Sequence, residues 1–208
     1  TVSGGDVNNH ELSDIVIGVL SSIGRGNIYF PAGIAYVIYG RSTDFSPVIT
    51  VDSNGSIDSN NNGLYGYVIN GLAGDGIGSL VRATGDFNGD NIKDIIIAAS
   101  SASDGSGEVT IIYGAQNGEI RSSINRYDLP TGSGHTIKNV YCHGIGTAYI
   151  STGDVNGDGI DDIAIPSYTA GKPGTKTYII YGNKEGLNIP DLSYINGTNG
   201  FIVYGWSS

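Results

Sequence analysis

A nine-residue loop rich in carboxylates recurs along this chain and limits what the chain can fold into. With the glycine before it, the loop reads GDFNGDNIKD at residues 85–94 and GDVNGDGIDD at residues 153–162, and a weaker copy, GDVNNHELSD, lies at residues 5–14. Every copy has oxygen-bearing side chains at loop positions 1, 3 and 9, and the two strong copies also have one at position 5. Carboxylates this close repel one another unless a cation lies among them. Hard oxygen ligands at alternate positions, with Gly or Asn at sharp turns, suit Ca²⁺.

The similarity extends beyond the loop on both sides. Residues 76–84 and 144–152 precede the two strong loops and align without a gap, and a segment ending in Tyr-Gly follows at residues 33–40, 107–114 and 175–182. The first loop residues, at 6, 86 and 154, are 80 and then 68 residues apart, and the longer first repeat has about six extra residues near 24–31. Repeats of this length that contain several strands indicate propeller blades.

Nearly every segment of the chain is predicted to be strand or turn. Residues 15–19, 95–99 and 163–165 are continuous apolar runs flanked by Gly, Ser and Asp, which is the pattern of a strand buried on both faces. Segments 46–51, 65–70, 136–141 and 200–204 are predicted outer strands. Apolar residues at helical spacing do not occur over any long window, and 34 glycines fit a fold with many tight turns.

With these residues in view, the chain resembles the FG-GAP repeats of the integrin α-subunit β-propeller and its bacterial relatives. Ile77-Gly78 and Ile145-Gly146 stand where the family has Phe-Gly, and Ala98-Ala99-Ser100 and residues 164–167 stand where it has Gly-Ala-Pro. The resemblance implies an all-β fold of four-stranded antiparallel blades in which the Ca²⁺ loop joins the first two strands. We expect one propeller segment over residues 1–208, with blades at about 1–73, 74–141 and 142–208.

The resemblance also implies which residues hold the metal. Two Ca²⁺ sites are expected, through side chains and one backbone carbonyl each: Asp86, Asn88, Asp90, Asp94 and the Ile92 carbonyl; then Asp154, Asn156, Asp158, Asp162 and the Ile160 carbonyl. The weaker copy keeps only Asp6, Asn8, Asp14 and the Leu12 carbonyl. There His10 replaces the position-5 acid, and imidazole is a poor ligand for a hard cation. The first loop is therefore expected to be empty or much weaker.

Three repeats cannot close the ring of about seven blades that the family forms. Because only five residues precede the first loop, blade 1 is expected to lack its inner strand, and the chain is expected to be part of a larger propeller. Exposed sheet faces and unpaired strand edges favour aggregation. Further blades, further copies of the chain or another protein chain are therefore expected to cover them.

The net charge, the length of the apolar runs and the acidic loops limit which partners and which location are expected. The net charge is −10, and two bound Ca²⁺ would contribute +4 and leave −6, which argues against binding to nucleic acid. Apolar runs are far shorter than the roughly 20 residues that span a bilayer. Loops of this kind fill where calcium is millimolar, so an extracellular or cell-surface protein is expected.

The sequence offers no recognisable catalytic set. Ser133-Gly134-His135 does not have the context of a nucleophile elbow, and His135 and His143 have no evident carboxylate partner. We expect a non-catalytic, calcium-stabilised interaction module for cell adhesion or assembly through protein–protein contacts. Two alternatives are a lectin-like propeller that binds glycans through its 14 tyrosines and Trp206, and the non-catalytic propeller of a larger enzyme or toxin.

Overall fold

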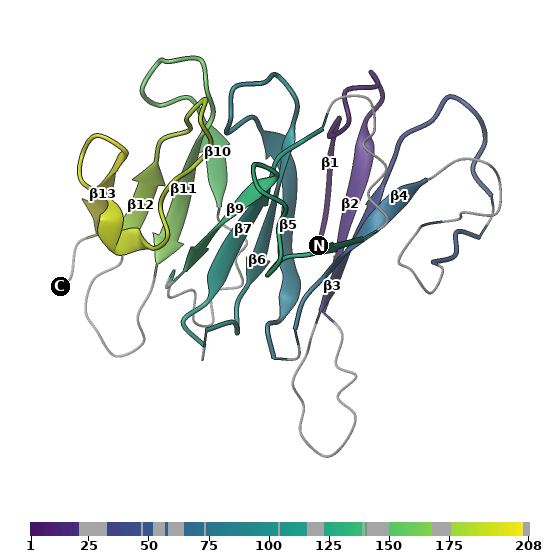
Figure 1. Cartoon of the computed structure of the whole chain (residues 1–208), viewed down its shortest axis with the longest axis horizontal. Helices are drawn as coiled ribbons and strands as arrows, with labels where there is room; N and C mark the ends of the chain where they lie inside the picture. Colours follow the sequence, from purple (N-terminus) through teal and green to yellow (C-terminus); the bar gives the residue numbers. More distant parts are fainter. Residues whose placement is uncertain are drawn as a thin grey trace.

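The computed structural model describes residues 1–20, 33–46, 48–51, 57, 65–72, 74–103, 105–115, 123–138, 140, 150–167 and 176–205. Within these ranges the regular structure is strand, apart from one 3-10 turn, η2 (Leu192–Tyr194). Three twisted sheets stand side by side along the chain, from blade 1 near β1–β4 to blade 3 near β10–β13 (Figure 1).

Each sheet is one blade whose four main strands pair antiparallel in chain order, which confirms the predicted fold class. Blade 1 contains β1 (Val2–Gly5), β2 (Asp14–Val19), β3 (Ile34–Ile38) and β4 (Gly66–Asn70). Blade 2 contains β5 (Ile77–Gly85), β6 (Asp94–Ala99), β7 (Glu108–Ile112) and β9 (Gly134–Lys138). Blade 3 contains β10 (Ser151–Gly153), β11 (Asp162–Ser167), β12 (Lys176–Ile180) and β13 (Gly200–Tyr204).

The core lies between the blades rather than inside any one of them. Every residue of β6 is buried, because alternate side chains point to opposite faces of the sheet. Ile95 and Ile97 belong to the cluster shared with blade 1, whereas Ile96 and Ala98 belong to the cluster shared with blade 3. The continuous apolar run of β6 is thus explained by a neighbour on each side.

Two strand predictions were wrong. Blade 1 does have an inner strand, since β1 pairs with β2 from Val2↔Ile17 to Gly5↔Asp14. Four residues suffice because the strand continues directly into the loop, and Gly5 lets β1 approach blade 2 so closely that a Cβ there would lie 2.0 Å from the Ala83 oxygen. Residues 46–51 do not form an outer strand: in their described part only Val51 makes an isolated bridge, to Ile57, and Ile49 packs on the small apolar cluster around Ile57. Residues 24–31 and 145–146 lie outside the described ranges.

One strand crosses from blade 2 to blade 1. The strand β8 (Ser123–Asn125) lies in the connection between β7 and β9, yet it pairs in parallel with β4, from Val68↔Ser123 to Asn70↔Asn125. The corresponding connection in blade 3, between β12 and β13, also pairs with the preceding blade. Asp191 forms a parallel bridge with Lys138 at the end of β9, and the Lys138 N–H donates to the Pro190 oxygen at 2.9 Å. The connection between the third and fourth strands therefore runs along the outer strand of the preceding blade.

A buried ionic network fixes β8 to blade 2. The guanidinium of Arg126, fully buried, donates to Asp75 at 3.1 Å and to Glu108 at 2.6 Å. The Tyr127 hydroxyl donates to the second oxygen of Asp75 at 2.7 Å. Asp75 and Glu108 are also buried, so the network attaches the chain after β8 to β7 and to the residues before β5.

Candidate metal centres

All three carboxylate loops join the first and second strands of a blade, as the family resemblance implied. They cover residues 6–13, 86–93 and 154–161. The three loops lie at the same end of the blades, at the top of Figure 1. Each expected metal ligand is therefore either on this short turn or at the first residue of the strand that follows it.

The position-9 aspartate of each loop attaches it to the third strand of the same blade. Asp14, Asp94 and Asp162 are buried, and one oxygen of each accepts the N–H of the position-2 residue at 2.7–2.8 Å. The other oxygen accepts, at 2.8–2.9 Å, the N–H of the glycine in the recurring Tyr-Gly. The two repeated sequence features, the acidic loop and Tyr-Gly, are thus parts of one hydrogen-bonded unit.

The two strong loops share one hydrogen-bond pattern. The position-1 carboxylate of Asp86 accepts the N–H groups of Gly89 and Asn91, both at 2.7 Å, and Asp154 accepts those of Gly157 and Gly159 at 2.6 and 2.9 Å. These donors have positive φ, from +67° to +85°, which explains Gly or Asn at positions 4 and 6.

Positions 3 and 5 also repeat their contact. The Asn88 amide donates to Asp90 at 2.9 Å, and the Asn156 amide donates to Asp158 at the same distance. The N–H of the position-7 residue, Ile92 or Ile160, donates to the other oxygen of that aspartate at 2.8 or 2.9 Å. The structure therefore brings positions 1, 3, 5, 7 and 9 into one compact turn in both loops.

The second loop has an uncompensated negative potential. Burial, together with the charges of Asp90 and Asp86, raises the pKa of Asp94 to about 7 despite the hydrogen bonds from Gly114 and Phe87, which lower it. A cation among these oxygens would favour the ionised form. The donors are carboxylate, amide and carbonyl oxygens, and this set fits a hard divalent cation such as Ca²⁺.

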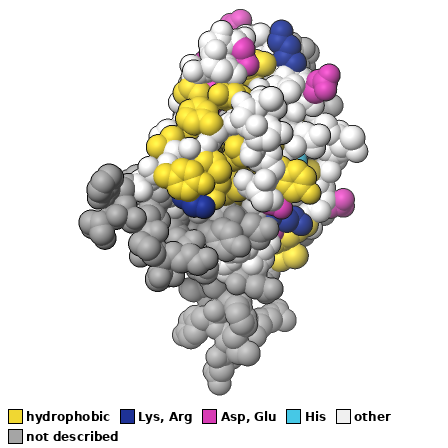
Figure 2. Space-filling view, turned by 90° about the vertical axis from the view of Figure 1, so that its left-hand side faces the viewer, with side chains coloured by type: hydrophobic (Ala, Val, Ile, Leu, Met, Phe, Trp, Pro, Cys, Tyr) yellow, Lys and Arg dark blue, Asp and Glu magenta, His cyan; other side chains and the backbone are white. Residues whose placement is uncertain are grey.

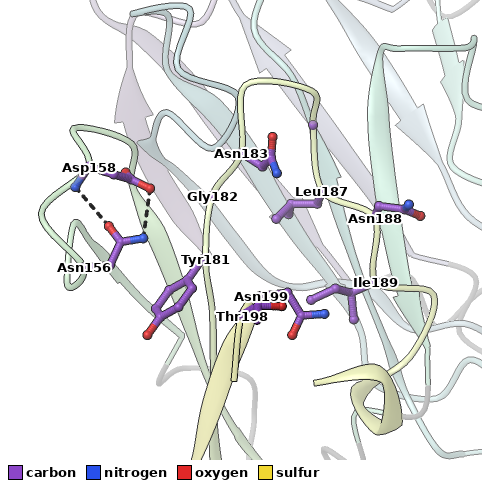
Figure 3. A pocket seen from close by; sticks show the side chains of 11 residues that line it. Asn156, Asp158, Tyr181, Gly182, Asn183, Leu187, Asn188, Ile189, Thr198 and Asn199 are labelled. Carbon is purple, nitrogen blue, oxygen red and sulfur yellow. Dashed lines mark hydrogen bonds between the residues drawn. The ribbon is translucent and has the colours of Figure 1, made fainter. Parts of the chain in front are cut away.

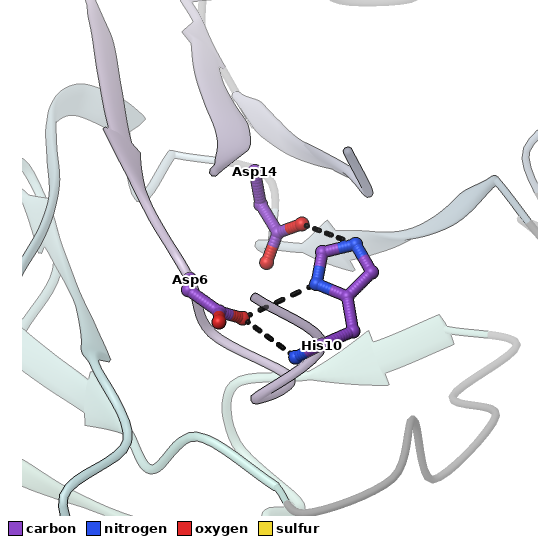
Figure 4. A group of neighbouring side chains, drawn as sticks. All are labelled: Asp6, His10 and Asp14. Carbon is purple, nitrogen blue, oxygen red and sulfur yellow. Dashed lines mark hydrogen bonds and ion pairs between the residues drawn. The ribbon is translucent and has the colours of Figure 1, made fainter. Parts of the chain in front are cut away.

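The first loop is closed by its own histidine (Figure 4). The His10 ring lies with Nδ1 3.3 Å from Asp6 Oδ1 and with Nε2 2.7 Å from the Gly40 oxygen and 3.6 Å from Asp14 Oδ1. Burial lowers the pKa of His10, but hydrogen bonds to Gly40 and Asp6 and the charges of Asp14 and Asp6 give a net increase. The imidazole therefore brings partial positive charge between the two carboxylates.

The loops also contact the next blade, a role that the sequence analysis missed. The Lys93 N–H donates to the Asp6 oxygen at 3.1 Å, and one repeat later the Asp161 N–H donates to the Asp86 oxygen at 2.9 Å. At position 2, the carbonyls of Val7 and Phe87 accept N–H groups from the next blade, and both side chains are buried. The signal was an apolar residue at position 2 of an otherwise polar loop.

Comparison with protein families agrees with this repeat structure. A family described as "FG-GAP-like repeat" matches residues 86–165, and a second, "FG-GAP repeat", matches residues 150–181. Residues 86–181 of the chain therefore match FG-GAP repeat families. The matched ranges contain both strong loops, and the His10 loop lies outside them. No curated protein matches the chain.

Proposed function

We propose that this chain is a calcium-stabilised, non-catalytic interaction module that acts outside the cell or on its surface, in adhesion or assembly. The observation that supports it most is the repeated loop, which has the same hydrogen bonds at residues 86–94 and 154–162. Two turns that place the same oxygen donors in the same frame indicate one shared ligand.

The proposed calcium would stabilise the interface between successive blades. Asp86 accepts the backbone N–H of Asp161 through its own carbonyl, and its N–H donates to the Asp161 side chain at 2.9 Å. A cation held by Asp86, Asn88, Asp90 and Asp94 would therefore fix the residue that links blade 2 to blade 3. This is a structural role, and the ion would take no part in a reaction.

The histidines offer little support for catalysis. His135 Nε2 lies 2.8 Å from the Ile189 oxygen, so this ring joins blade 2 to the blade 3 connection. His143 lies outside the described residues. In the described part of the chain, no helix is long and apolar enough to cross a membrane.

Thermal melts with calcium and with a chelator test the proposal. With a dissociation constant of about 0.1 mM, millimolar Ca²⁺ would add roughly 1.5 kcal/mol to the free energy of unfolding per site. Asp90→Ala and Asp158→Ala should each remove most of one site's contribution. Asp128→Ala is the matched control, because Asp128 is exposed and outside the loops. An equal melting temperature with calcium and with chelator would contradict the structural role.

A further inference from the structure

The first loop differs from the other two in the chemistry of its donors. At position 5 it has His10, where the strong loops have an aspartate. One oxygen of Asp6, one oxygen of Asp14 and one ring nitrogen of His10 all lie within 4.8 Å of one another (Figure 4). Two carboxylates and an imidazole this close together form a donor set for a metal ion. Imidazole is a common ligand of first-row transition metals and a poor one for calcium.

The hydrogen bonds of the His10 ring leave one nitrogen available for a metal. Nε2 lies 2.7 Å from the Gly40 oxygen, which can only accept, so Nε2 carries a hydrogen. In the neutral ring the lone pair of Nδ1 then faces Asp6 Oδ1, 3.3 Å away, and the two atoms repel each other unless a cation lies between them. Histidines that bind metals commonly donate their other N–H to a backbone carbonyl in this way.

The distances in this loop suit a small ion. A separation of 3.3 Å between Nδ1 and Asp6 Oδ1 is long for an N–H···O hydrogen bond. It fits two ligands of tetrahedral Zn²⁺, which bind at about 2.0–2.1 Å and therefore lie about 3.4 Å apart. The side chains of His10 and Asp6 are 30% and 27% exposed, whereas that of Asp14 is fully buried. An ion can thus enter from solvent and meet Asp14 at the inner end of the loop.

A further donor is buried in the same loop without a partner. Asn8, at position 3, is 6% exposed, and its Oδ1 accepts no hydrogen bond. In the third loop the corresponding oxygen, on Asn156, accepts the N–H of Asp158 at 3.0 Å (Figure 3). In the first loop the N–H of His10 donates to Asp6, at 3.1 Å, and not to Asn8. A buried acceptor without a donor costs free energy, and a cation in the loop would satisfy it.

The charge around the loops attracts any divalent cation, so the ligand set must supply the selectivity. Figure 2 shows several Asp and Glu side chains at the upper end of the molecule, the end at which the loops lie in Figure 1. The whole chain has 20 acidic and 10 basic residues. The strong loops offer oxygen donors alone, which suit calcium, and the first loop adds a nitrogen, which favours zinc.

We propose that the first loop is a structural zinc site with Asp6, Asn8, His10 and Asp14 as its ligands. His10 binds through Nδ1, and the four side chains supply the four donors of a closed, structural Zn²⁺ site. Because Nε2–H also holds the Gly40 oxygen, the ion connects the residues that follow β1 and β3 with the start of β2. The proposal is independent of the calcium role of the other two loops and goes beyond it.

Calorimetric titration with Zn²⁺ in millimolar calcium tests the site, since calcium at this concentration keeps zinc from the loops that have only oxygen donors. The wild type should bind one Zn²⁺. His10→Gln retains an N–H donor for the Gly40 oxygen but has no ring nitrogen. It should weaken zinc binding at least about a hundredfold, because loss of groups that only orient a ligand already weakens binding about 10–100-fold. Asn8→Ala should weaken it about tenfold.

The other candidates for zinc binding serve as controls. His135→Gln changes a ring in β9, outside the loops, and should leave zinc binding unchanged. Cys142 and His143 are adjacent in the sequence and lie outside the described residues, and the double variant C142S/H143A should also bind zinc as the wild type does.

Long-range ¹H–¹⁵N spectra of the imidazole rings give a second readout on the wild type itself, so it does not depend on whether a variant folds. Zn²⁺ should shift the Nδ1 resonance of His10 and leave Nε2 protonated.

Three results would overturn the proposal. One is a wild-type chain that binds no zinc in calcium. Another is equal zinc affinity of the wild type and His10→Gln. The third is zinc binding that is lost in C142S/H143A, with the Nδ1 resonance of His10 unmoved. Equal affinity of Asn8→Ala and the wild type would overturn the assignment of Asn8 as a ligand. A chain that binds zinc at His10 but is indifferent to calcium would contradict the calcium role alone.

Discussion

Single residues decide what each loop does. The same backbone frame surrounds Asp14, Asp94 and Asp162, but position 5 is histidine in one loop and aspartate in the other two. The sequence was enough to predict which oxygen-bearing residues come together in one turn, because their spacing is fixed within nine residues. It could not predict that His10 bonds to Gly40, since that contact depends on where β3 ends.

Replacing His10 with Asp should create a third calcium site. The change removes the ring that lies between Asp6 and Asp14 and supplies the carboxylate that the strong loops have at this position. Loss of one anionic ligand should weaken a site at least tenfold, or about 1.4 kcal/mol, and the substitution should restore it. Calorimetric titration should then count three calciums instead of two.

His10→Ala is the control for that experiment. It removes the imidazole without adding an oxygen ligand, so the count should stay at two and the loop should lose its hydrogen bond to Gly40. A wild-type chain that already binds three calciums with similar affinity would show that His10 does not impair the first loop.

Position 2 of the loop should matter for stability only where another blade covers it. Phe87→Ala removes a fully buried ring from the core between blades 2 and 3 and should cost about 3–5 kcal/mol. Val155→Ala at the same loop position should cost less than about 0.5 kcal/mol in dilute protein, because its side chain is mostly exposed. Urea denaturation of both variants in chelator measures their free energies of unfolding without calcium. Equal losses of unfolding free energy in the two variants would contradict the assignment of Phe87 to the blade interface.

At the scale of elements, the strands buried on both sides were the most predictable. β6 has an unbroken apolar run, and β13 was predicted with its observed bounds, Gly200–Tyr204. β8 was missed because it has only three residues, two of them polar, and its partner β4 belongs to another blade. Its place is fixed by tertiary contacts, chiefly the buried Arg126, and these leave no periodic pattern in the sequence.

Arg126→Met should therefore loosen the attachment of β8. The substitution leaves Asp75 and Glu108 buried without their shared cation, which should cost about 3–5 kcal/mol of unfolding free energy. Tyr127→Phe removes only the hydroxyl that donates to Asp75 and should cost about 1 kcal/mol. Urea denaturation measures the unfolding free energy of both variants. A methionine variant as stable as the wild type would mean that the network adds no net stability.

At the scale of the whole molecule, three blades share two interfaces and a strongly negative charge. The sequence predicted the repeat and the sign of the charge because both are sums over many residues. It could not show that each interface is built from the same backbone bonds, such as Lys93 to Asp6 and Asp161 to Asp86. That equivalence between successive blades depends on backbone contacts between residues about 75–87 positions apart, which leave no local pattern in the sequence.

Salt should stabilise the metal-free protein more than the calcium-bound protein. The net charge is −10 and carboxylates are clustered in the loops, so repulsion between like charges destabilises the folded protein when calcium is removed by a chelator. Added sodium chloride screens this repulsion. Calcium bound as proposed would neutralise much of the charge of the two strong loops, and salt would weaken its binding there, so the gain in melting temperature should be smaller or reversed. Melting temperatures across a range of salt, with calcium and with chelator, measure the two slopes. The variant D90N/D158N removes one charge from each strong loop, so in chelator its melting temperature should rise less with salt than that of the wild type. If the melting temperatures of all samples rise equally with salt, repulsion within the loops does not limit the stability of this molecule.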